Sequence, residues 1–119
     1  MGRRSRQRRD RDEPVAPTTD YTDPEGNVLT LRGAMTPATR REYAEVRAGS
    51  PLSQEDAWQR AVEFLFERLA VRWTIADVPI EKQKELLQRF RFASQEERTW
   101  IRGALREHLA EWFPDVEAP

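Results

Sequence analysis

The chain has 119 residues, of which 34% are charged and 38% apolar, and its formal net charge is −1. This length suits one domain with one modest core, and the aromatic and aliphatic content is too high for a chain that is disordered throughout. There is no cysteine, which excludes disulfides, thiolate chemistry and cysteine-bound zinc. No run approaches the roughly 20 apolar residues that span a bilayer, so we expect a cytoplasmic protein without membrane contact.

The N-terminal segment differs in charge from the rest of the chain. Residues 1–13 hold six arginines against three acids, a charge of +3 that leaves −4 for the remainder. With Pro14 and Pro17 and few large apolar residues, residues 1–20 are predicted to be a disordered basic arm and linker. The arm either contacts nucleic-acid phosphates nonspecifically or is a solvated tail that aids solubility. The candidate phosphate-contacting residues are Arg3, Arg4, Arg6, Arg8 and Arg9.

A turn signal follows the arm. Pro24 and Gly26 occupy the second and fourth positions expected of a type I turn, and residues 28–31, Val-Leu-Thr-Leu, have strand propensity. Residues 21–32 are therefore expected to form a short hairpin, or a single extended segment that could pair with another chain. Two strands alone are only marginally stable in water, so this segment should pack against the helices.

Two serine capping signatures begin the strongest predicted helices. Ser53 precedes a helix over about 54–75, and Ser94 precedes one over about 95–113 that Pro114 ends. These helices carry all four tryptophans. Their apolar residues fall on one arc of each helix, which predicts that both helices pack against a common core.

Two weaker helices complete the prediction. Thr36 and Pro37 begin a helix over about 37–48, and Asp77 with Pro79 begins another over about 79–92. Short connections between four helices are typical of a bundle. The predicted fold is therefore mainly α, with residues 21–119 forming a single helical domain: a compact bundle of about four helices preceded by a short hairpin or extended segment and a disordered basic arm.

An arginine row on the last helix is the most specific surface feature. Arg98, Arg102 and Arg106 recur at four-residue spacing, and no Asp or Glu stands three or four positions from any of them. The row is interpreted as a docking face for an acidic partner or a phosphate. The alternative is that acids of another helix, Asp56, Glu63 and Glu67, pair with it, or that it is merely solvated.

Three aromatic residues are candidate interface anchors because they lie off the apolar arcs or near element ends: Phe64, Phe92 and Trp112. By contrast, Trp58, Leu65, Leu69 and Trp100 are expected to be core residues.

His108, the single histidine, lies on the apolar arc of the last helix. One histidine cannot build a metal site, and the favoured interpretation is a core-edge side chain bonded to a main-chain carbonyl. No catalytic, metal or phosphate-loop motif is recognisable. The sequence thus predicts no cofactor and a non-enzymatic protein-protein interaction module, such as an adaptor, assembly or regulatory factor; the alternative is a nucleic-acid-associated protein that binds through the arm.

Overall fold

The computed structural model describes residues 16–49 and 53–119. The described residues form four strands and four helices, in the order β1 (Thr18–Thr22), β2 (Val28–Arg32), α2 (Pro37–Ala48), α3 (Gln54–Leu69), β3 (Ala70–Ile75), β4 (Val78–Ile80), α4 (Gln83–Arg91) and α5 (Gln95–Trp112). None of these helices is both long enough and apolar enough to cross a membrane.

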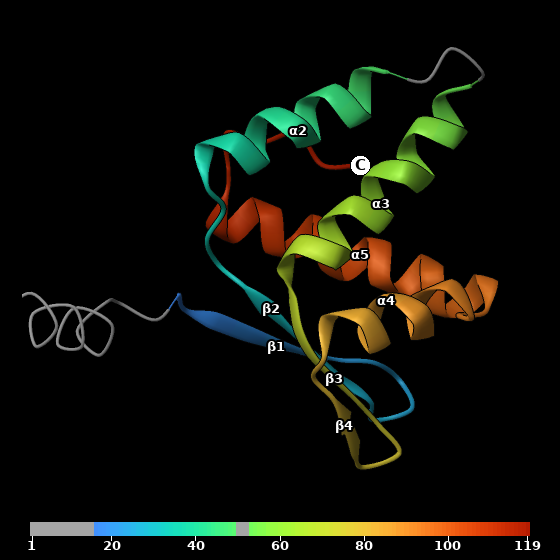
Figure 1. Ribbon diagram of the computed structural model, residues 1–119. Coiled ribbons are helices and arrows are strands. Elements are labelled where there is room, and N and C mark those ends of the chain that lie inside the picture. Colours follow the sequence, from blue (N-terminus) through green and yellow to red (C-terminus); the bar gives the residue numbers. More distant parts are fainter. Residues whose placement is uncertain (1–15, 50–52) are drawn as a thin grey trace, which may run out of the picture.

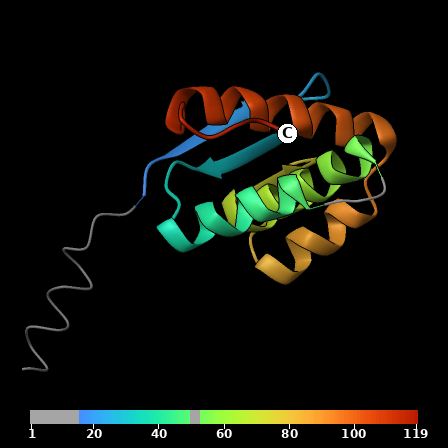
Figure 2. The same cartoon turned by 90° about the horizontal axis from the view of Figure 1, so that it is seen from above.

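The strands form one antiparallel sheet in the order β1-β2-β3-β4. Helices α3, α4 and α5 lie over one face of this sheet, with α5 on the β1 side and α4 on the β3 side, and α2 packs on α3 (Figures 1 and 2). Tyr21, Leu29 and Trp73 are partners across neighbouring strands, so their side chains share the face beneath the helices. The core is therefore built between this face of the sheet and the helices.

The prediction of a mainly α bundle is wrong, because residues 70–80 form a β-hairpin that completes a four-stranded sheet. The second helix ends at Leu69 instead of residue 75, and the third begins at Gln83 instead of residue 79. Alternation of apolar and polar residues over 71–75 suits a half-buried strand. Because Trp73 fits both that alternation and the helical arc, the local pattern could not distinguish the two, and pairing with β2 decides in favour of the strand.

The turn between β3 and β4 explains why Asp77 does not begin a helix. Ala76 and Asp77 have φ angles of 50° and 66°, and they form the two-residue loop between the paired residues Ile75 and Val78. Positive φ at both loop residues is the pattern of a type I′ turn, whose twist matches that of the strands. Asn-Gly would have signalled this turn, whereas Ala-Asp does not.

The N-terminal hairpin and the capped helix starts are confirmed. Strands β1 and β2 pair through a turn at residues 23–27, although β1 begins at Thr18, inside the segment predicted to be linker. The Ser53 and Ser94 side chains accept hydrogen bonds from the main chain three residues later, and Ser94 forms a full capping box with Glu97. Thr36 caps α2 in the same way.

The tryptophans mark the core less well than the aliphatic residues. Trp73 is buried, whereas Trp58 and Trp100 are only partly buried, contrary to expectation. Leu65 and Leu69 are fully buried as predicted. The largest fully buried side chains also include Tyr43, Phe66, Phe113, Leu29, Leu31, Ile101, Leu105 and Leu109.

Candidate functional site

The arginine row of α5 is directed at main-chain oxygens. The Arg102 Nε and an Arg106 terminal nitrogen both donate to the main-chain oxygen of Pro119, at 3.1 Å and 2.7 Å. Arg98 donates to the carbonyl oxygen of Arg91 at 2.9 Å. The row therefore joins α5 to the C-terminal segment at one end and to the end of α4 at the other.

The C-terminal segment is held from its other side by α2. The Tyr43 hydroxyl donates to the carbonyl oxygen of Glu117 at 2.5 Å, and Arg40 pairs with Asp115 at 3.2 Å. Arg47 also pairs with the Glu117 carboxylate. Residues 113–119 thus connect the α2 layer to α5 through charged and main-chain contacts.

Two of the three acids considered as partners for the row, Glu63 and Asp56, pair with other arginines, and Glu67 has no ion pair with the row. Glu63 pairs with Arg91 at 3.3 Å, and Asp56 pairs with Arg60 at 3.1 Å. Within residues 16–49 and 53–119, none of the three row arginines forms an ion pair with a side-chain carboxylate. The basic character of this side of α5 is therefore not neutralised by the acids of α3.

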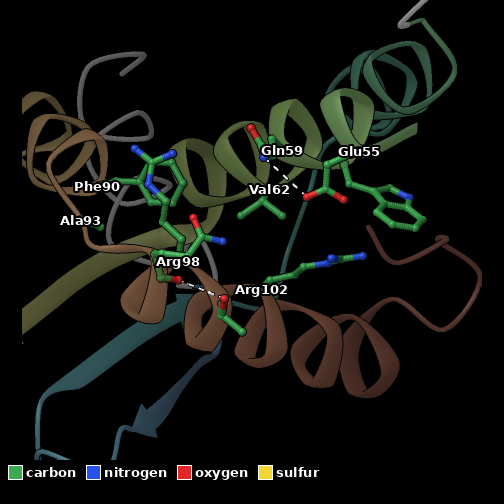
Figure 3. A pocket seen from close by; sticks show the side chains of 10 residues that line it. Glu55, Gln59, Val62, Phe90, Ala93, Arg98 and Arg102 are labelled. Atoms are coloured by element: carbon green, nitrogen blue, oxygen red, sulfur yellow. Dashed lines mark hydrogen bonds between the residues drawn. The ribbon is translucent and has the colours of Figure 1, made fainter. Parts of the chain in front are cut away.

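A groove of about 320 Å³ lies beside the row, between α3 and the start of α5 (Figure 3). Helix α3 contributes one wall, and the end of α4 with the first turns of α5 contributes the other. The lining residues are Glu55, Trp58, Gln59, Val62, Phe90, Ala93, Gln95, Arg98, Thr99 and Arg102.

Two arginines of the groove are oriented by aromatic rings. The Arg98 guanidinium lies 5.2 Å from the centroid of Phe90, and that of Arg102 lies 4.5 Å from the centroid of Trp58. In Figure 3 the two side chains diverge from α5, with Arg98 directed toward Phe90 and Arg102 toward the Glu55 side. Stacking fixes the plane of a guanidinium, and each group has five N–H donors, of which only one is used on a main-chain oxygen here.

The three aromatic candidates have different environments. Phe92 is 80% exposed and directly precedes Ala93, which lines the groove. Phe64 is partly buried, stacks on Tyr43 with centroids 6.2 Å apart and lies under Arg68. Trp112 is also partly buried, and its indole N–H donates to Thr19 at 2.9 Å. None of the three lines the groove beside the arginine row, and Phe92 is the one whose neighbour in the sequence does.

His108 is a buried structural residue, as expected from the sequence. Its side chain is fully buried; its Nε2 lies 2.7 Å from the carbonyl oxygen of Arg32 and its Nδ1 lies 2.8 Å from the Tyr21 hydroxyl. A carbonyl can only accept, so Nε2 carries the proton and Nδ1 accepts from Tyr21. Burial lowers the His108 pKa despite the opposing effects of the Arg32 carbonyl and Glu111. Both ring nitrogens are occupied, so neither is available to a metal or a substrate.

The other sequence-based expectations concern metals and the arm. The part of the chain that the structure describes contains no cluster of three or more His, Cys, Asp or Glu side chains arranged to hold a metal ion. The arm arginines, Arg3, Arg4, Arg6, Arg8 and Arg9, lie outside the described residues.

Sequence reasoning missed the groove because it assigned Trp58 to the core. The helical arc correctly placed Trp58 on the same side of α3 as Leu65 and Leu69, but near the start of α3 that side faces Arg102 and the groove. The position of Trp58 near the start of its helix, away from the centre of the core, was the signal that could have indicated partial exposure.

Comparison of this chain with protein-family models, curated proteins and solved structures finds no match. The function must therefore be inferred from the chemistry of the surface. The groove offers two oriented guanidinium groups and a partly exposed indole, with an exposed phenyl ring nearby, which together can bind a carboxylate and apolar atoms.

Proposed function

We propose that the protein is a non-enzymatic interaction module, an adaptor, assembly or regulatory factor, which binds an acidic segment of a partner protein in the groove between α3 and α5. The observation that carries this proposal is the pair Arg98 and Arg102, both stacked on aromatic rings and, among the described residues, without an ion pair to an Asp or Glu side chain. Oriented guanidinium groups bind carboxylates through two parallel hydrogen bonds, which gives directional recognition.

The aromatic surroundings support the same proposal. Arginine and large aromatic residues are enriched in the energetically important centres of protein interfaces. Trp58 lies in the groove, and Phe92, one residue before the lining residue Ala93, has an exposed ring whose removal from water by a docked partner would be favourable. Glu55 in the same groove would repel an acidic ligand from the α3 end and so restrict where the carboxylate can sit.

The test compares proteins captured from a native lysate by the wild type, Arg98→Glu and Phe92→Ser. Arg41→Glu is the matched control, because Arg41 is an exposed arginine of α2 that does not line the groove. We expect a partner that the wild type and Arg41→Glu capture and that both groove variants lose by at least about tenfold, the effect of about 1.4 kcal/mol.

A cooperative urea transition in each of the four proteins would show that the variants are folded. A partner list unchanged in Arg98→Glu and Phe92→Ser would rule out this groove as the interface. A glutamate-rich peptide added to the lysate should compete with the true partner, whereas a lysine-rich peptide should not.

A further inference from the structure

The two edges of the sheet are protected to different degrees. At one edge, β4 has only three residues, Val78–Ile80, and contains Pro79. Short edge strands and proline are devices that prevent pairing with another chain. At the other edge, β1 has five residues without proline or lysine, and its pairing with β2 has no bulge. The β1 edge is therefore geometrically able to accept a further strand.

The hydrogen-bond register shows which main-chain groups face outward. Gly33 donates to Pro17, and Asp23 donates to Asn27, so alternate residues 17, 19, 21 and 23 direct their main-chain groups toward β2. It follows that the N–H and C=O groups of Thr18, Asp20 and Thr22 point away from the sheet. Among the described residues, none of these outward groups has a main-chain partner.

A groove of about 530 Å³ runs along this edge, between β1 and α5. In Figure 2 α5 passes over β1. The wall that α5 contributes is open in the middle, because a Cβ added at Gly103 would meet no atom within 4 Å. The lining residues are Asp20, Tyr21, Thr22, Trp100, Gly103, Ala104 and Glu107.

The groove is acidic. Asp20 and Glu107 line it, and Glu111 lies one helical turn further along α5. Burial, followed by the negative charges of Glu111 and Glu107, raises the pKa of Tyr21 to about 12. The neighbouring pocket, which shares Trp100, adds Asp23, Glu25, Glu96 and Glu97. An occupant with lysine or arginine side chains would be attracted along the whole edge, and Trp100 can stack on such a cation.

We propose that the β1 edge and α5 form a second binding site, distinct from the arginine groove, which takes an extended basic segment of a partner protein as a fifth strand of the sheet. Main-chain hydrogen bonds to Thr18, Asp20 and Thr22 hold the segment, and its alternate side chains on the α5 face are basic and meet Glu107 and Trp100. This is strand addition, in which the main chain provides affinity and side-chain pockets provide specificity.

The binding test uses the full chain and a fluorescein-labelled eight-residue peptide of alternating lysine and valine. The control peptides alternate glutamate and valine, or carry proline at two central positions. We expect the basic peptide alone to bind, with an affinity that falls as salt increases. Glu107→Gln should weaken binding about threefold, the size expected for one exposed charge pair.

Two pairs of variants distinguish peptide binding at the β1 edge from binding elsewhere on the surface. Thr22→Pro removes an outward N–H without breaking the ladder with β2, and Thr22→Val keeps that N–H. Gly103→Gln fills the open wall, and Gly103→Ala does not. We expect Thr22→Pro and Gly103→Gln to weaken binding about tenfold, and the two controls to bind as the wild type does.

Amide hydrogen exchange gives a readout that a general electrostatic effect would not produce. On peptide binding, the N–H groups of Thr18, Asp20 and Thr22 should gain protection, whereas those of Thr19 and Tyr21, already bonded to β2, should change little. Peptide binding unaffected by Thr22→Pro and Gly103→Gln would overturn the proposal. So would a dimer of the free protein that Thr22→Pro abolishes, since the edge would then serve a second copy, or peptide binding only after deletion of residues 1–15.

Discussion

Helix α5 separates two surfaces of opposite charge that use their polar groups differently. On the basic side, Arg98 and Arg102 stack on rings and donate to main-chain oxygens of the same chain. On the acidic side, Glu107 stands across a groove from β1, whose outward main-chain groups have no partner among the described residues. The arginine row is thus partly used in contacts within the fold, whereas the outward main-chain groups of β1 have no main-chain partner among the described residues. The amino-acid composition gives no sign of this strand edge.

The largest expected effect concerns the residue that joins α5 to the sheet between these surfaces. His108→Ala would leave a cavity in the core and deprive both the Tyr21 hydroxyl and the Arg32 carbonyl of their partner. We expect a loss of about 4 kcal/mol in the free energy of unfolding, measured by urea denaturation followed by tryptophan fluorescence. A loss below about 1 kcal/mol would show that α5 does not depend on this contact.

The basic side is tested by releasing the C-terminal segment. Arg102→Ala combined with Arg106→Ala removes both hydrogen bonds to Pro119 and the stacking on Trp58. Because these groups are partly exposed, we expect about 2 kcal/mol of destabilisation. Arg41→Ala, on exposed α2 surface, should cost less than about 0.5 kcal/mol. Equal midpoints for the two variants would mean that the row is a solvated face.

The protonation of His108 should make the free energy of unfolding depend on pH. Its folded-state pKa is lowered, chiefly by burial, so as the pH falls through about 6.5 the unfolded chain takes up a proton before the folded chain does. Stability is therefore full above about pH 6.5 and declines below it. The decline should be smaller than the loss in His108→Ala, because the ring stays in place and Nε2 can still donate to Arg32. His108 is the single histidine, so His108→Gln should remove this part of the pH profile; a decline that persists in that variant would assign it to carboxylates.

The sequence predicted the parts of the molecule that depend on neighbouring residues. The caps at Ser53 and Ser94 fix helix starts through local hydrogen bonds, Gly49 follows the end of α2, and the boundaries that these residues predicted agree with the structure to within a few residues. The satisfied environment of His108 also followed from its place on an apolar arc. These features need no knowledge of the rest of the chain.

The sequence could not predict what depends on pairing between distant segments. Strand β3 exists because Leu29 and Trp73, 44 positions apart, become partners, and no local periodicity reports such a pairing. The same holds for the strand order, which makes β1 an edge, and for the path of the C-terminal segment, which brings Pro119 to the arginine row. Both candidate sites therefore depend on tertiary placement.

The smallest expected effect concerns Gly103, in the wall that α5 contributes to the groove beside β1. Gly103→Ala should raise the free energy of unfolding by about 0.5–1 kcal/mol, because alanine favours a helix interior over glycine and the added Cβ meets no atom within 4 Å. A thermal melt measures this gain. A stable Gly103→Ala that still accepts the basic peptide would show that the helix has no structural need for glycine and that the groove tolerates a methyl group. A destabilised variant would instead mean that the wall at position 103 is closed, and the contrast between the two sides of α5 would then be one of charge alone.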